Sequence, residues 1–194
     1  MLAGYVTSVW TELVLRSFAR ETNLLLPSTR VLVVGGGPVA DSLAIALTRL
    51  GGRVEVASDD PVELVAIAHR SAVVARHIVT AQFISADVDV VIATGRSHPP
   101  LTPDAVATAD RPLIAVNAAL PPDGDAAAFH ADGIIGTTRN LAQLAGSRPI
   151  FAVPRVSPDE LDHAVAEAHS TFADVLAVVG PDNVEAEFAK ALLS

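Results

Sequence analysis

The sequence predicts an α/β protein of the Rossmann type: a doubly wound parallel sheet of about five to seven strands, covered by helices on both faces in three layers. Segments typical of strands and of helices alternate between residues 31 and 118, as they do in strand–helix–strand units. Hydrophobic residues make up 51% of the 194 residues but aromatic residues only 4%, so Ala, Val, Leu and Ile must build the core. Three consecutive glycines follow the first predicted strand, where folds of this type bind nucleotides.

Apolar spacing and helix-capping residues define the expected elements up to residue 118. The expected strands are the apolar runs 31–34, 54–57, 72–75, 87–95 and 112–118. The expected helices and helical turns are 8–20, 38–50, a helix from Pro61, 80–85 and 103–109. Asp60 is expected to cap the helix that begins at Pro61, and Glu63 to complete a capping box with it.

The rest of the chain is expected to add strands and helices. Residues 133–136 and 148–154 would extend the sheet, with a short helix between them that Thr138 caps. Ser157 and Glu160 form a second capping box, which begins a long helix. Its apolar stripe ends before Gly180 and consists of Leu161, Val165, Ala168, Phe172, Leu176 and Val179. A last helix is expected to begin at Asp182.

We therefore predict two parts: a dinucleotide-binding domain over residues 1–155, which includes the N-terminal helix, and a helical extension over residues 156–194. The extension either packs on the sheet or pairs with a second copy across a two-fold axis. Because its stripe is longer than one small sheet face requires, a homodimer is the predicted assembly.

Charge and composition exclude several classes of protein. The net charge of −9, with a single lysine at position 190, argues against nucleic acid as a partner. The absence of cysteine excludes disulfides and thiolate metal sites, and the histidine spacing supports no metal site. The sequence has neither an apolar run long enough to span a membrane nor a signal peptide, so a cytoplasmic protein is expected.

The stretch VLVVGGGPVADSLAIAL, residues 31–47, fits the dinucleotide-binding pattern G-x-G-x-x-[G/A] with Gly35, Gly37 and Ala40. The first glycine permits a tight turn, the second lets a pyrophosphate approach the backbone, and Ala40 lets the helix pack on the strand. The candidate residues for the pyrophosphate, at the N-terminus of the helix, are Gly35, Gly36, Gly37, Pro38 and Val39. Pro38 lacks an N–H donor, and Asp41 would repel phosphate unless it points away.

Three further positions near strand ends are candidates for ligand binding. Asp59 follows the second strand, where an acid would bind ribose hydroxyls, and since no arginine follows it, NAD is favoured over NADP. Arg96 could hold a phosphate or a carboxylate. His98, in the same loop, is a candidate general base or substrate contact.

Residues 21–61 resemble the NAD-binding domain of S-adenosyl-L-homocysteine hydrolase without a gap, from Thr29 before the first strand, through the glycine loop, to Asp60-Pro61. DVVIATG, residues 89–95, is similar to the fourth strand of that family and implies that Thr94 and Gly95 lie in the cofactor site. AVNA, residues 115–118, is similar to the following strand and implies that Asn117 touches the cofactor. The resemblance covers about residues 13–125.

The chain departs from that family at functional positions. The ribose-binding Glu of the family falls on Ser58, and a frequent cofactor-binding Asn falls on Arg96. The family's Asn-x-Gly-His becomes Asn117-Ala118-Ala119-Leu120, which lacks the His. The chain has no room for the family's large substrate domain with its catalytic Lys, Asp and His residues. The resemblance therefore implies an NAD-binding domain and not a complete hydrolase.

Three functions stay open at this point. The first is a stand-alone NAD-binding domain, acting alone or within a larger oxidoreductase that uses the cofactor for hydride transfer. The second is a non-enzymatic sensor or scaffold that binds a dinucleotide, another adenosine-containing molecule or no ligand. The third is an enzyme like precorrin-2 dehydrogenase, because VLVVGGGPVA, residues 31–40, resembles the opening of that family.

Overall fold

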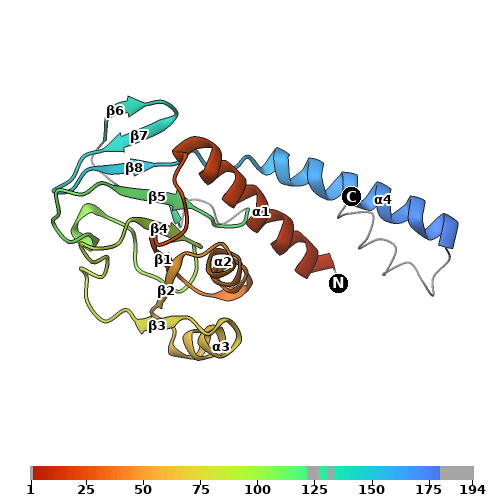
Figure 1. The fold of residues 1–194 in the computed structure, drawn as a ribbon, viewed down its shortest axis with the longest axis horizontal. Coiled ribbons are helices and arrows are strands. Elements are labelled where there is room, and N and C mark those ends of the chain that lie inside the picture. The colour runs from red at the N-terminus through yellow and green to blue at the C-terminus, as the bar shows by residue number, and fades with distance from the viewer. Residues whose placement is uncertain (1, 122–126, 131–132, 180–194) are drawn as a thin grey trace. The chain divides into compact units, whose positions relative to one another are not determined.

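The computed structural model describes residues 2–121, 127–130 and 133–179, which belong to two compact units, Met1–Val156 and Ser157–Ser194. The helices are α1 (Leu2–Thr22), α2 (Gly37–Arg49), α3 (Pro61–Ser71) and α4 (Pro158–Val179), with a 3-10 turn η1 (Pro103–Ala105) (Figure 1). The strands are β1 (Arg30–Val34), β2 (Arg53–Ser58), β3 (Val74–His77), β4 (Val90–Ala93), β5 (Leu113–Asn117), β6 (Ile134–Thr138), β7 (Leu141–Leu144) and β8 (Ile150–Ala152).

The described strands form one sheet in the order β3-β2-β1-β4-β5-β8-β7-β6. Neighbouring strands run parallel from β3 to β8, whereas β7 and β6 continue the sheet antiparallel. The predicted α/β fold with a mostly parallel sheet is confirmed. The described sheet has eight strands, more than the five to seven predicted, because the chain after β5 contributes three strands.

The segment between the last two predicted strands forms a β-hairpin, and the prediction of a helix there is wrong. β6 and β7 pair antiparallel with Thr138 opposite Leu141, so Thr138 ends a strand and caps no helix. Arg139 makes the turn with φ of 54°, a left-handed conformation usually marked by Gly or Asn. Position 139 is neither Gly nor Asn, so the local sequence does not indicate the turn, and a helix is predicted instead.

Helices α1, α2 and α3 cover one face of the sheet, with α2 in contact with both of the others (Figure 1). The apolar stripe predicted for α1 is buried at Trp10, Val14 and Phe18. The indole Nε1 of Trp10 donates a hydrogen bond of 2.8 Å to the carbonyl oxygen of Ala118, just after β5. This bond fixes α1 at the edge of the sheet where the parallel strands end.

Irregular connections cover the opposite face of the sheet, where the three-layer prediction expected helices. The helical turn expected at 80–85 is wrong, because Ile84 is extended and forms a parallel bridge with Val106. The helix expected at 103–109 is reduced to η1. These connections share one core with alternate strand residues, and its larger members include Leu32, Ile78, Phe83, Ile84, Val91, Leu101, Val106 and Leu113.

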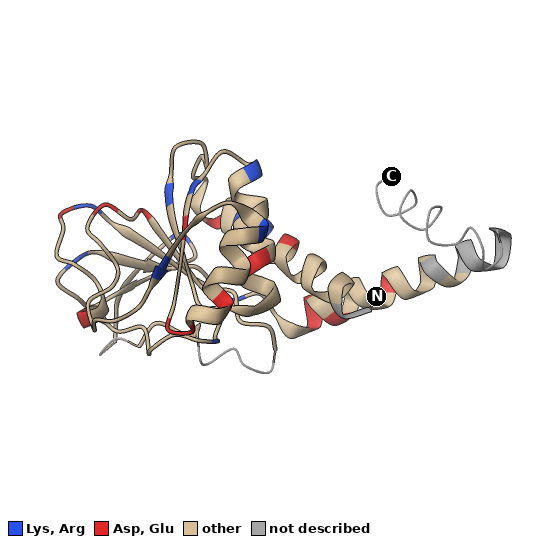
Figure 2. Cartoon of the chain, turned by 90° about the horizontal axis from the view of Figure 1, so that it is seen from below, with Lys and Arg blue, Asp and Glu red and all other residues tan. Residues whose placement is uncertain are grey.

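Acidic and basic residues alternate along the elements of the first unit (Figure 2). Arg30 forms an ion pair with Asp87, and Arg111 forms one with Asp89. In each pair at least one of the two side chains is half exposed or more. Each pair therefore contributes little to stability.

The second unit contains α4, which begins with the predicted capping box. The Ser157 N–H group donates to Glu160 Oε2 at 3.1 Å, and the Asp159 N–H group donates to Ser157 Oγ at 3.2 Å. The side chains of Phe172, Leu176 and Val179, and the helix expected from Asp182, lie outside the described residues. Neither α4 nor any other described helix has the length and apolar character that a membrane span requires.

Arg148 joins the connections on the second face to the amino ends of the strands. Its side chain is 1% exposed. The guanidinium donates to the carbonyl oxygens of Arg111 (2.7 Å), Ser85 (3.3 Å), Val88 (2.6 Å) and Pro112 (3.2 Å). Burial, and secondly the charge of Arg111, lower the pKa of the Arg148 guanidinium from its ordinary value. One buried cation thus supplies hydrogen bonds to carbonyls that precede both β4 and β5.

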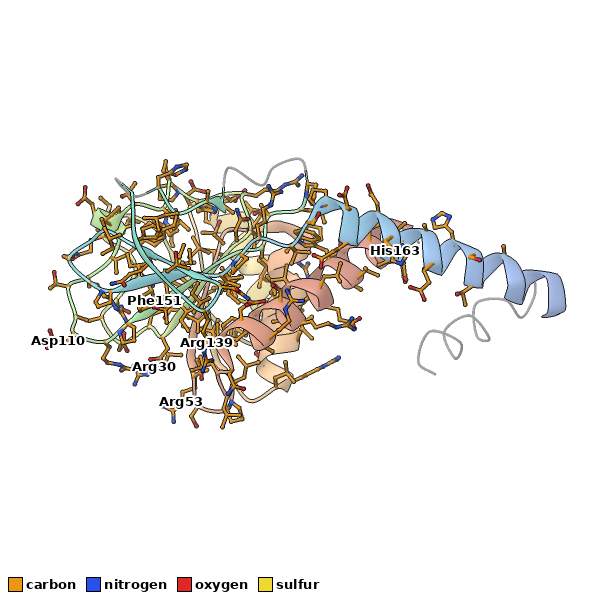
Figure 3. The ribbon with its side chains drawn as sticks, turned by 90° about the horizontal axis from the view of Figure 1, so that it is seen from above. Arg30, Arg53, Asp110, Arg139, Phe151 and His163 are labelled. Atoms are coloured by element: carbon orange, nitrogen blue, oxygen red, sulfur yellow. The ribbon has the colours of Figure 1, made fainter. Side chains whose placement is uncertain are left out.

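We expect Arg148→Met to lower the free energy of unfolding by about 3 kcal/mol, because buried carbonyl oxygens lose their donors. Arg53, which is exposed at the start of β2 (Figure 3), provides the matched control. Arg53→Met should change the free energy by less than about 0.5 kcal/mol. Urea unfolding measures both variants, and equal effects would contradict the role given to Arg148.

Glu21, which is 7% exposed, ties the β6–β7 hairpin to the end of α1 and predicts a pH dependence. Hydrogen bonds from Arg20 Nε (2.7 Å) and Asn140 Nδ2 (2.6 Å) lower the pKa of the Glu21 carboxyl. Because the folded-state pKa is the lower one, this stabilisation is present above the ordinary value of 4.5 and is lost as the pH falls through the folded value. Denaturant unfolding at several pH values should show a shallower acid-side decrease for Glu21→Gln and Asn140→Ala. A decrease identical to wild type in both would refute the link.

Candidate functional site

The glycine loop lies where the strand order reverses, between the ends of β1 and its two neighbours. Val34, the last residue of β1, pairs with Ala57 of β2 and Ala93 of β4. Gly35 therefore continues beside the ends of both strands. In open α/β sheets this switch point is the place where ligands bind. The structure brings most predicted site residues to this edge: Gly35, Gly36, Gly37, Pro38, Val39, Ser58, Asp59, Thr94, Gly95, Arg96 and Asn117.

Two glycines of the motif have the conformations that the motif requires. Gly35 has φ of 111° and Gly37 has φ of 80°, which other residues rarely adopt. A side chain at Gly35 would overlap Thr94 Oγ1 and the carbonyl oxygen of Arg96. Ala40 is fully buried, as expected for close packing of α2 on the sheet. The loop is thus a tight turn with backbone closely packed on one side.

Residues 95–98 cross from the end of β4 over β1 to the end of β2. The carbonyl oxygen of Arg96 accepts from the Gly36 N–H group at 3.1 Å. The carbonyl oxygen of Ser97 accepts from the Asp59 N–H group and from Ser58 Oγ, each at 2.9 Å. This segment closes the side of the crevice that faces β2.

A small pocket lies at the glycine loop, between α1, α2 and the ends of β4 and β5. Its volume is about 170 Å³, and it is lined by Thr7, Gly36, Pro38, Val39, Thr94, Arg96, Leu120 and Pro121. Pockets for organic ligands usually hold about 300–1,000 Å³. In this conformation the pocket accommodates a group of the size of a phosphate but not a whole dinucleotide.

His98 has both of its ring nitrogens in hydrogen bonds. Nε2 accepts from the Gly95 N–H group at 3.2 Å, and Nδ1 is 2.8 Å from the carbonyl oxygen of Pro99, to which it donates in this tautomer. The imidazole therefore holds the shape of the 95–98 segment. In this arrangement it has no nitrogen left for the proton transfer that the sequence suggested for it.

Two acidic residues, Asp41 and Asp59, lie near the glycine loop. Asp41 points away from the phosphate position, since Arg70 Nε of α3 donates to its Oδ2 at 2.7 Å. Asp59 is exposed at the end of β2, and Ser58 is completely buried. Asn117 is half-buried at the end of β5, where its Oδ1 accepts from the Ala119 N–H group at 3.1 Å.

Glu63 is the acid that the sequence reasoning did not place in the site. Its expected capping partner, the Asp60 N–H group, donates instead to Ser58 Oγ at 3.0 Å. Asp60 Oδ1 still caps α3 through the N–H groups of Val62 and Glu63. The Glu63 carboxylate is free to extend to the glycine loop, where a methyl group added to Gly36 would overlap Oε2. Only the hydroxyl of Ser58, two residues before Asp60, signals in the sequence that the capping box could fail.

Among the described residues, no group of three or more His, Cys, Asp or Glu side chains is placed to hold a metal ion. The chemistry of the edge is that of backbone N–H groups, one arginine and carboxylates.

Neither a protein-family model nor a curated protein sequence matches this chain. Its structure is similar to a chain of dipicolinate synthase from Bacillus halodurans, with 26% identity and a TM-score of 0.50 over 63% of this chain and 42% of that chain. It is also similar to L-alanine dehydrogenase, with 17% identity and a TM-score of 0.55 over 94% of this chain and 56% of that chain. For transhydrogenase from Sinorhizobium meliloti the identity is 16% and the TM-score 0.52, over 85% of this chain and 51% of that chain.

The latter two similarities establish the fold: this chain has a Rossmann-type domain like those of dehydrogenases. The chain spans only about half the length of these solved chains, 42% to 56%. The similarities therefore concern a domain-sized part of those proteins and do not bear on the reactions of the whole proteins.

The overlap of Gly36 and Glu63 predicts a coupling between the two positions. Gly36 has φ of −126°, which any residue adopts, and the nearest atoms to a side chain there belong to Glu63, with the carboxylate overlapping it and Cβ at 3.2 Å. We expect Gly36→Ala to lower the free energy of unfolding by about 1 kcal/mol. In the Glu63→Ala background, where only the 3.2 Å contact with Cβ remains, the same change should cost clearly less. A double-mutant cycle by urea unfolding measures the coupling, and an equal cost of Gly36→Ala in both backgrounds would show that Glu63 lies elsewhere.

Proposed function

We propose that this chain is a nicotinamide-dinucleotide-binding module, with NAD preferred over NADP, that serves a dehydrogenase-type oxidoreductase. The observation that carries the proposal is the pocket at the N-terminus of α2, at the switch point of a Rossmann-type sheet. The N–H groups of Gly37 and Val39 belong to the first turn of α2, where a helix attracts phosphate. Arg96, which lines the same pocket, supplies a positive charge.

The size of the pocket makes opening of the 95–98 segment part of this proposal. Binding of a whole dinucleotide requires release of the three hydrogen bonds that Gly36, Asp59 and Ser58 donate to the carbonyls of Arg96 and Ser97. At about 1 kcal/mol each, their loss lowers the affinity by about a hundredfold relative to an open site. We therefore expect a modest affinity for NAD.

The similarity to dipicolinate synthase and the resemblance of residues 21–61 to the cofactor domain of S-adenosyl-L-homocysteine hydrolase support this proposal. Bound NAD would supply hydride transfer, and the residues of this chain would hold and orient the dinucleotide. The substrate would be bound by another domain or another protein chain. A homodimer through the apolar stripe of α4, and residues 156–194 as a separate extension, remain predictions.

A non-enzymatic scaffold is the second candidate, and the 95–98 segment favours it. The Arg96 and Ser97 carbonyls already satisfy N–H groups that face the crevice, and His98 has no free ring nitrogen. A protein that never binds a dinucleotide has no need to keep these groups available. Ligand binding distinguishes the two candidates.

Thermal unfolding with NAD⁺, NADH, NADP⁺ and adenosine tests the proposal, since a ligand at about 100 times its Kd adds about 2.7 kcal/mol to stability. We expect a rise in Tm with NAD⁺. His98→Ala removes the Gly95 and Pro99 contacts, loosens the 95–98 segment and should tighten NAD⁺ binding about fivefold. No response of wild type or His98→Ala to any of these ligands would exclude the cofactor module and leave the scaffold.

A further inference from the structure

The carboxylate of Glu63 presents a buried acceptor without a donor. Oε2 is inaccessible to solvent and has no hydrogen-bond partner among the described residues. A buried carboxylate oxygen in that state is destabilising, because it has lost its hydrogen bonds to water and has gained none within the protein. Such an atom next to a ligand-binding loop indicates a missing donor.

The protein groups nearest to Glu63 do not supply that donor. The Gly35 N–H group donates to the carbonyl oxygen of Ala57 at 2.7 Å, and that of Gly36 donates to Arg96. The Asp60 N–H group donates to Ser58 Oγ, and Arg70, on the same helix as Glu63, pairs with Asp41. A ligand with hydroxyl groups would supply the donor that Glu63 Oε2 lacks.

We propose that Glu63 binds the hydroxyl groups of the adenosine ribose of NAD, the role that the sequence assigned to Asp59. This inference rests on the proposed function. Glu63 belongs to the helix that follows β2, the side of the sheet on which a Rossmann fold holds the adenosine half of a dinucleotide. Its carboxylate lies against Gly36, the middle residue of the glycine triplet, whereas Asp59 is exposed to solvent.

Charge determines which part of the dinucleotide meets Glu63. The diphosphate is anionic and has only acceptors, so it is repelled by the carboxylate and lies toward Val39 and Arg96. The ribose hydroxyls are neutral donors and form charge-assisted hydrogen bonds with a carboxylate. NADP carries a phosphate in place of the adenosine 2′-hydroxyl, and that phosphate would face Glu63. The carboxylate therefore selects NAD.

The test is calorimetric titration of wild type, Glu63→Gln and Asp59→Asn with NAD⁺, NADP⁺ and the NAD⁺ analogue that lacks the adenosine 2′-hydroxyl. Wild type should bind NAD⁺ about tenfold more tightly than the 2′-deoxy analogue. Glu63→Gln should lose about tenfold in NAD⁺ affinity, with little preference left between NAD⁺ and the analogue. Asp59→Asn, which alters the neighbouring exposed acid, should behave as wild type.

The possible results separate this inference from the proposed function. If wild type binds NAD⁺ and Glu63→Gln binds it equally or more tightly, Glu63 obstructs the site and the inference is wrong, while the proposed function stands. Loss of affinity in Asp59→Asn alone would assign the ribose to Asp59. If wild type binds no dinucleotide, both fail together. Because Glu63→Gln replaces a buried carboxylate oxygen that has no hydrogen-bond partner with a neutral amide, the variant should unfold at or above the wild-type temperature without ligand, and this measurement shows that the variant is folded.

Discussion

The carbonyl groups of Arg96 and Ser97 determine what the carboxyl edge of this sheet can do. A parallel sheet brings the ends of β1, β2 and β4 together, and the N–H groups that follow these strands need acceptors. In this chain the 95–98 segment supplies them to Gly36 and Asp59. The same hydrogen bonds order the glycine loop, which lines a pocket of about 170 Å³. In the proposed function, stability of the ligand-free site and affinity for a dinucleotide therefore oppose each other.

The fold around this edge is held from two directions. On the helical face, Trp10 bonds the end of β5 and places α1 beside the pocket. On the other face, where irregular connections replace helices, the buried Arg148 supplies donors to the carbonyls before β4 and β5. A long connection without regular structure leaves many backbone groups without partners. One guanidinium with its five N–H donors satisfies several of them at once.

Local patterns in the sequence were sufficient for much of the fold but not for the chemistry of the site. Strand–helix alternation, the glycines and the capping box at Ser157 are properties of neighbouring residues, and the structure contains them. The capping box at Asp60 failed because Ser58 Oγ took the same N–H group. The position of Glu63 over Gly36 depends on the packing of α3 beside α2. The path of residues 95–98 depends on the order of the strands, in which β2 and β4 flank β1. The spacing of residues along the sequence does not indicate this path.

In the proposed function, the glycine loop receives the diphosphate of NAD after the 95–98 segment moves. Two-dimensional ¹H–¹⁵N NMR during titration with NAD⁺ observes the N–H groups concerned. We predict that the resonances of Gly36, Gly37, Val39 and Asp59 shift together, because binding replaces the carbonyl acceptors of Gly36 and Asp59. Resonances of the β6–β7 hairpin, at the far end of the strand order, should stay unchanged. Saturable shifts confined to any other surface, with the loop resonances unmoved, would contradict this claim.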